Sequence, residues 1–152
     1  MNIQKFTQKS LEAIQNSQAI AMDNQNQQVE QEHVLLALLE QENSLIKELL
    51  EKMKVSKEFE NEVRNSIKNK PKVISGTNQS GNIYISPDLE QALNDAEKTA
   101  QKMKDEYVSV EHIMLGIFEK ANSNLKQLFK QFGIDKNKFL KVLLEVRGNA
   151  RV

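Results

Sequence analysis

The residues best suited to chemistry in this chain are two histidines, each preceded by a glutamate, in the pairs Glu32–His33 and Glu111–His112. Such pairs could supply metal ligands. A zinc site, however, uses three or four converging ligands, and neither pair has a second His or a suitably placed Asp at helical spacing. The alternative is a metal site in which each half of the chain supplies one Glu-His pair and the two pairs meet across a pseudo-twofold axis. We favour a structural role, in which each Glu stabilises the first turn of a helix and each His packs its ring and forms hydrogen bonds.

Other catalytic patterns are missing from the sequence. Asp105 and Glu111 flank one short loop and could approach each other, but paired carboxylates are common on solvated helix ends. No Ser lies in a G-x-S-x-G turn, and the five glycines form no phosphate-binding G-x-x-x-x-G-K-[ST] loop. Cysteine is absent, which removes thiol nucleophiles, disulfides and thiolate metal ligands. The sequence therefore predicts a chain that is not an enzyme and that carries no cofactor and no metal.

The composition also limits the partners. Lys and Arg total 21, as do Asp and Glu, so no overall field attracts nucleic acid or an anionic membrane. The start, MNIQKFTQKS, has no apolar signal region, and no apolar run approaches the roughly 20 residues of a membrane span. The lack of cysteine fits a protein from the reducing interior of a cell. These features predict a cytoplasmic protein without nucleic-acid or membrane partners.

The two Glu-His pairs belong to a duplicated stretch. VEQEHVLLALLE, residues 29–40, returns 79 positions later as VSVEHIMLGIFE, residues 108–119. The same offset pairs Val55 with Ile134, and most other pairs exchange one apolar residue for another. A fixed offset held over many positions indicates a duplicated structural unit. A duplicated helical unit has a seam, and a seam is a natural place to bind something.

Apolar residues at helical spacing predict four helices in the first half of the chain. Thr7 is a suitable N-cap for a helix that runs to about Asp23. A second helix is expected at about 31–42, and its run 34–39 is apolar nearly all round, which predicts a central, buried helix. Two shorter apolar stripes, within 45–53 and 55–67, mark the third and fourth helices.

The second half repeats this pattern after a linker. From 69 to about 85, proline and glycine stand among polar residues, a composition typical of linkers. We discount a short strand signal at 83–85. Ser86-Pro87-Asp88 is a typical helix start, Ser109 is a suitable cap for the next helix, and Gly133 separates the last two helices. The expected fold class is all-α, with eight helices as two pseudo-twofold-related four-helix repeats.

Together these repeats make one expected domain, residues 1–152. Repeat one covers about 6–68 and repeat two about 86–147, with the linker at about 69–85.

The chain resembles the N-terminal domain of the ClpB-type disaggregases, in the wider Clp N-domain family. The resemblance is carried by the segments FTQKSLEAI, KPKV and VRGNARV and by the two Glu-His helices. The resemblance covers the whole chain. The RGNARV ending is similar to the junction before the first ATPase module, which suggests a domain excised from a larger AAA+ chaperone.

The resemblance implies a binding role. In the family this domain engages exposed apolar segments of unfolded or aggregated proteins and passes them to an ATP-driven pore. It also implies ATPase modules in the same full-length chain, which would bind ATP and magnesium, and co-chaperones of the heat-shock system. The isolated domain is expected to be monomeric and the full-length protein hexameric. The alternatives are an adaptor-docking N-domain of a protease-partnered Clp ATPase and, less favoured, an enzyme built on a helical bundle.

The resemblance also implies a groove between the repeats, lined mostly by repeat two. Its expected polar residues are Thr7, Asp105 and Glu111. Its expected apolar lining, with Leu93 partly exposed, is Leu89, Leu93, Ala96, Val108 and His112. The sequence departs from some relatives by placing Asp95 and Thr99 where they have apolar groove residues.

Overall fold

The computed structural model describes residues 2–73 and 83–148, so part of the expected linker and the end of the RGNARV motif lie outside the described residues. The regular structure of the described part is helical apart from two strands of two residues each, which confirms the all-α expectation. Its elements are a 3-10 turn η1 (Ile3–Lys5), helices α1 (Gln8–Asp23), α2 (Gln31–Glu40), α3 (Leu45–Lys52), α4 (Glu58–Lys68), α5 (Pro87–Lys102), α6 (Val110–Glu119), α7 (Ser123–Gln131) and α8 (Lys136–Arg147), and the short strands β1 (Gln28–Val29) and β2 (Tyr84–Ile85).

The helices begin where the capping residues predict. The side-chain oxygen of Thr7 accepts a hydrogen bond from the Ser10 N–H at 3.1 Å, and that of Ser86 accepts one from the Leu89 N–H at 3.1 Å. Each bond satisfies one of the amide groups that a helix leaves free in its first turn. Gly133 follows α7 with a φ of +66°, a left-handed conformation that glycine adopts without strain.

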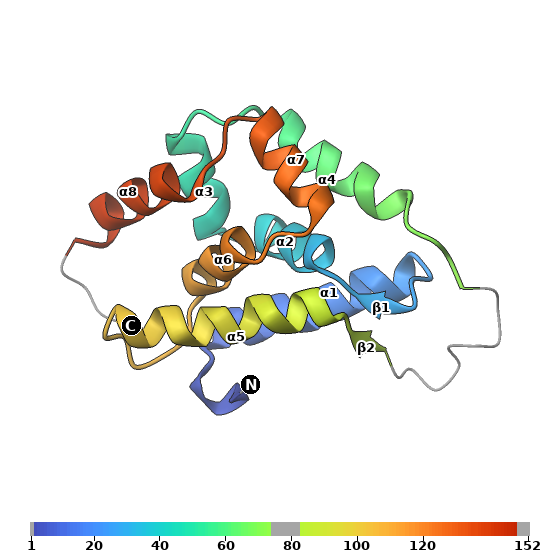
Figure 1. The fold of residues 1–152 in the computed structure, drawn as a ribbon, viewed down its shortest axis with the longest axis horizontal. Helices are drawn as coiled ribbons and strands as arrows, with labels where there is room; N and C mark the ends of the chain where they lie inside the picture. Colours follow the sequence, from blue (N-terminus) through green and yellow to red (C-terminus); the bar gives the residue numbers. More distant parts are fainter. Residues whose placement is uncertain (1, 74–82, 149–152) are drawn as a thin grey trace.

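Helices α2 and α6 form the middle layer of the molecule. Figure 1 shows them between α1 and α5 on one side and α3, α4, α7 and α8 on the other. The residues of 34–39 in α2 and 113–115 in α6 are all buried, which confirms that both helices are central. The N-termini of these two helices carry the Glu-His pairs, so the pairs lie inside the fold.

Short extended segments of each repeat pair with segments of the other repeat. Strand β2 pairs in parallel with β1, with Ile85 opposite Val29, and an isolated parallel bridge joins Phe6 to Val108. At the offset of 79, Phe6 corresponds to Ile85 and Val29 to Val108, so the same pairing occurs twice. The prediction that 83–85 forms no strand is therefore wrong for Tyr84 and Ile85. Their pairing partner lies in the other repeat, where local sequence gives no sign of it.

Side-chain packing joins the repeats as well. Helix α3 packs against α6 and α8, and α4 packs against α7. The ring of Phe59 in α4 lies 6.0 Å from that of Phe129 and 5.5 Å from that of Phe132, centroid to centroid. Such distances are typical of packed aromatic pairs. The apolar side chains of both repeats thus form one continuous core along the seam.

Candidate functional site at the seam of the repeats

The start of α1 and the start of α6 meet at the Phe6–Val108 bridge. The Thr7 N–H donates to the Val108 carbonyl at 3.0 Å, and the Val108 N–H donates to the Lys5 carbonyl at 2.7 Å. The Ser10 hydroxyl donates to the same Val108 carbonyl at 2.9 Å. The structure therefore brings Thr7 and Val108, two of the residues expected at the site, into direct contact, although the Val108 side chain is buried.

His112 forms the buried centre of this region. The Ser109 N–H donates to His112 Nδ1 at 2.9 Å, so the ring carries its proton on Nε2 and donates it to Asp105 Oδ2 at 2.7 Å. The other oxygen of Asp105 pairs with the guanidinium of Arg147 at the end of α8. The side chains of His112 and Asp105 are fully buried. Both residues are thus buried beneath the surface, and their part in binding stays a prediction.

Glu111 lies in the first turn of α6, next to His112 in sequence. Only 4% of the residue is exposed. Across residues 2–73 and 83–148, no hydrogen bond or ion pair involves its carboxylate. A carboxylate in such a place is stabilised by the helix dipole, and it gains further from a donor supplied by another molecule. Within the described residues, the carboxylate of Glu111 therefore has hydrogen-bonding capacity to spare.

The apolar residues expected to line a groove lie in the core. Leu89 and Ala96 are buried, and Leu93 is 1% exposed, so the expectation that Leu93 is partly exposed is wrong. The reason is the closeness of α5 to α6: a Cβ added at Gly116 would lie 2.2 Å from the Ala92 carbonyl oxygen. With no side chain between the helices, the apolar stripe of α5 is covered by α6. Any role of these residues in binding is indirect and stays a prediction.

Two large apolar side chains near the bridge are exposed, and the sequence did not point to them. Tyr107, directly before Val108, is 45% exposed, and Ile3, in the turn before Phe6, is 55% exposed. Both stand outside the helical stripes, so periodicity carried no information about them. A large apolar residue within an otherwise polar loop was the available signal.

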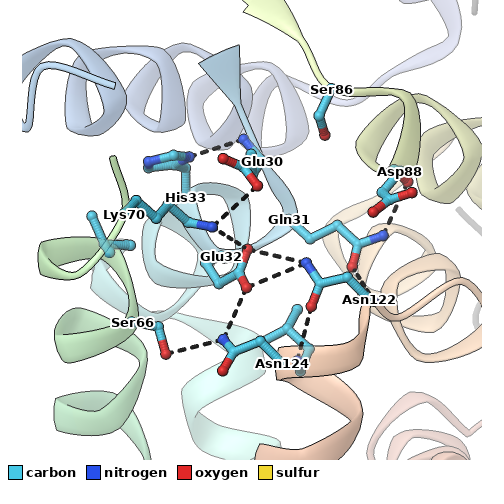
Figure 2. Close-up of polar contacts among 12 residues, drawn as sticks. Glu30, Gln31, Glu32, His33, Ser66, Lys70, Ser86, Asp88, Asn122 and Asn124 are labelled. Carbon is cyan, nitrogen blue, oxygen red and sulfur yellow. Dashed lines mark hydrogen bonds and ion pairs between the residues drawn. The ribbon is translucent and has the colours of Figure 1, made fainter. Parts of the chain in front are cut away.

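Repeat one contains the same arrangement around His33 (Figure 2). The Glu30 N–H donates to His33 Nδ1 at 2.9 Å, and His33 Nε2 donates to Asn26 Oδ1 at 2.8 Å. At the offset of 79, Asn26 corresponds to Asp105. Burial, together with the positive charge of Lys70, lowers the pKa of His33 to about 4, so its ring is neutral at pH 7.

The carboxylate of Glu32, the counterpart of Glu111, has partners on every side (Figure 2). Lys70 Nζ lies 3.2 Å from it, Asn124 Nδ2 donates to it at 2.9 Å, and Asn122 Nδ2 lies 3.2 Å from both oxygens. Burial alone raises the pKa of Glu32, but the charge of Lys70 and the amide hydrogen bonds outweigh burial and hold the pKa below its usual value. This network crosses the seam into α7, and the sequence analysis missed it.

Neighbouring Gln31 extends the same network. Its Nε2 donates to the carbonyls of Asp88 at 3.0 Å and Lys120 at 2.8 Å, and its Oε1 accepts from the Asn122 N–H at 2.8 Å. Polar residues that begin an otherwise apolar helix were the sequence signal for these contacts. The network leaves repeat one without an open carboxylate at this position.

The described residues offer no metal centre. Within 2–73 and 83–148, no three His, Asp or Glu side chains are grouped so as to hold a metal ion. Among the helices of these residues, none is long and apolar enough to cross a membrane.

Residues 5–132 match the family model of the Clp repeat (R) N-terminal domain. The chain belongs to this family. Over 153 aligned residues it is 39% identical to the chaperone protein ClpB of Clostridium tetani and 39% identical to that of Bacillus anthracis, and each alignment covers the whole chain. This Clp N-terminal domain spans 18% of the length of these curated relatives.

Solved structures support the assignment of this chain to the family of Clp N-terminal domains. The Hsp104 N-terminal domain from Candida albicans is 26% identical and superposes with a TM-score of 0.82 over 97% of this chain and 94% of that one. A ClpV N-domain solved in complex with a VipB peptide is 19% identical and has a TM-score of 0.73, over 95% of this chain and 88% of that one. The latter likeness shows the shared fold.

Proposed function

We propose that this chain is the N-terminal substrate-binding domain of an ATP-dependent protein disaggregase of the ClpB type. It binds exposed apolar segments of unfolded or aggregated proteins and passes them to an ATPase ring. In this proposal the ATPase modules belong to the same full-length chain, bind ATP and magnesium, and form a hexamer in the cytoplasm. The names of the relatives and their much greater length support this part of the proposal.

One observation carries the binding role: the carboxylate of Glu111 has no partner in the described part of the chain, and Glu111 follows, by three positions, the Val108 that bridges to Phe6. Tyr107 and Ile3 offer apolar contact area to a client. Glu111 accepts hydrogen bonds from main-chain amides or cationic groups of the client. Thr7, whose amide is bonded to Val108, fixes the spacing between the two helix starts.

Titration of an unfolded model protein into the labelled domain, followed by NMR, tests this proposal. We expect the largest chemical-shift changes at Thr7, Tyr107 and Glu111. Tyr107→Ala should weaken binding, whereas Tyr84→Ala is the matched control, because Tyr84 is the other tyrosine and is 72% exposed on β2. Shift changes confined to other surfaces, or equal effects of the two substitutions, would contradict it.

An adaptor-docking role is the competing outcome. The ClpV complex with a VipB peptide shows that a domain of this fold can receive a specific peptide. If a folded Clp adaptor binds this chain and unfolded protein does not, the adaptor-docking role replaces client binding.

A further inference from the structure

Residues 70–73, which follow α4, lie against the loop between α1 and β1. The Val73 N–H donates to the Gln25 carbonyl at 2.7 Å, and Asn26 Nδ2 donates to the Pro71 carbonyl at 3.2 Å. These bonds engage main-chain groups of the segment, which a peptide of almost any sequence also offers. The loop therefore receives residues 70–73 in the way that a protein surface receives an extended peptide.

Two lysines of the segment add charge contacts. Lys72 Nζ donates to the main-chain oxygen of Asn24 at 3.1 Å and to its Oδ1 at 2.8 Å. Lys70 Nζ lies 3.1 Å from Glu30 Oε1 and 3.2 Å from Glu32 Oε1 (Figure 2). Because Glu32 is 1% exposed, the ammonium of Lys70 enters a largely desolvated site, where charge pairing is selective.

A hollow of about 340 Å³ opens beside this ammonium. Glu32 and Lys70 form one side of it, and residues of α4 and α7, among them Asn65 and Gln127, form the others. An incoming side chain can thus approach Glu32 from solvent without the helices separating.

Repeat two provides the comparison. Glu111 occupies the place of Glu32, and no described residue supplies it with a cation. Among the described residues, a cation therefore lies beside this carboxylate in repeat one alone. The segment that supplies it in repeat one indicates the kind of ligand that this place accepts: an extended chain with a cationic side chain.

We propose that the loop of residues 24–26, with Glu30 and Glu32, is a second polypeptide-binding site, selective for an extended segment that bears lysine or arginine and occupied in cis by residues 70–73. This inference rests on the proposed function for the nature of its ligand, a client polypeptide, and adds both a location and a side-chain preference. Occupation in cis reduces the apparent affinity for an added peptide in proportion to the fraction of time that the site is open.

The chain's own segment is the probe. Acetyl-Lys-Pro-Lys-Val-amide is titrated by NMR into the wild-type chain, into Lys70→Gln and into Lys68→Gln. Lys68 is an exposed lysine at the end of α4, two positions before Lys70, and serves as the matched control. Lys70→Gln should bind the peptide at least about tenfold more tightly than the wild type, because its cis segment no longer competes through a cation. The side-chain amides of Asn122 and Asn124, which donate to Glu32, should report the binding. Lys68→Gln should behave as the wild type.

Two results would overturn the inference: no gain of affinity in Lys70→Gln, or a gain that survives Glu32→Gln in the same chain. If Lys70→Gln does not fold, Lys72→Ala takes its place, since Lys72 is exposed and leaves the buried ion pairs intact. A gain of about threefold is then expected, and no gain overturns the inference.

The outcomes separate this inference from the proposed function. A wild-type chain that binds unfolded protein, with no gain in the Lys70 or Lys72 variant, overturns the second site alone. A Glu32-dependent gain in a chain that does not bind unfolded protein supports the second site and overturns the proposed function.

Discussion

In repeat one the buried histidine, His33, donates to an amide, Asn26, whereas in repeat two His112 donates to a carboxylate, Asp105. Both histidines accept a hydrogen bond from the main-chain N–H at the start of their helix. That shared bond explains why each repeat has a histidine there. The differing partner has a wider consequence, because a buried carboxylate needs a cation and draws Arg147 from the end of α8.

The neighbouring glutamates differ in the opposite sense. Glu32 forms an ion pair with Lys70 and accepts hydrogen bonds from two asparagines, while Glu111 has no partner among the described residues. Within the described residues, the duplication has thus placed a stabilising network around the glutamate of one repeat and no partner beside the glutamate of the other. We infer that repeat two presents the main site, whereas the second site in repeat one is occupied by residues 70–73 and its network holds the seam together.

Removing the acceptor of each histidine should give the largest difference between the repeats. Asp105→Ala leaves the charge of Arg147 buried without its carboxylate, at an expected cost of about 3–5 kcal/mol. Asn26→Ala removes a neutral acceptor and should cost about 1–3 kcal/mol. Urea unfolding of the two variants measures both values. Equal losses would mean that the ion pair with Arg147 adds nothing to stability.

The helix pairs should respond differently to one methyl group. Gly116 in α6 corresponds to Ala37 in α2, and a Cβ at Gly116 would lie 2.2 Å from the Ala92 carbonyl oxygen. Gly116→Ala should therefore cost about 1–3 kcal/mol as overpacking. Ala37→Gly should cost about 1–2 kcal/mol through helix propensity and the loss of a buried methyl group, with no overpacking. Thermal melts compare the two, and a neutral Gly116→Ala would show that α5 and α6 can separate freely.

Acid should destabilise repeat one through His33. Its folded pKa of about 4 is below the unfolded value near 6.5, so the unfolded state binds more protons between these values and stability falls as the pH falls through that window. The expected loss from pH 7 to pH 5 is about 2 kcal/mol for this group. His33→Gln should lack that part of the pH dependence in denaturant titrations. The same slope in both proteins would contradict the assignment.

The matched helix caps should give the smallest effects. Thr7→Ala and Ser86→Ala each remove a side-chain bond to the first turn and should each cost ~1 kcal/mol. If Thr7 also takes part in the site, only its substitution should weaken client binding beyond what the stability loss explains. Parallel measurements of melting temperature and client affinity separate the two effects.

The sequence predicted the helices well because their evidence is local. Caps such as Ser86 and the apolar run in α2 define where a helix starts and which of its faces are buried. The burial of Leu93 was missed because periodicity gives the direction of a side chain and not the distance to its neighbour. Gly116 permits that closeness, but the spacing of residues does not show that Gly116 in α6 lies against α5.

The polar part of the site was harder to predict. Asp105 was assigned to binding by resemblance, and its contacts with His112 and Arg147 depend on residues 7 and 42 positions away. The pairing of β2 with β1 depends on the other repeat in the same way. Contacts of this kind arise from tertiary structure, which residue spacing within one helix does not encode.

Calorimetric titration of an unfolded model protein into Glu111→Gln and Glu32→Gln, with the melting temperature of each, tests the central claim most directly. We expect Glu111→Gln to weaken client binding about tenfold or more, equivalent to about 1.4 kcal/mol, while its melting temperature stays near that of the wild type. Glu32→Gln should lower the melting temperature and leave client binding nearly unchanged. Unchanged client binding in Glu111→Gln, or equal losses of binding in the two variants, would contradict the division of roles between the repeats.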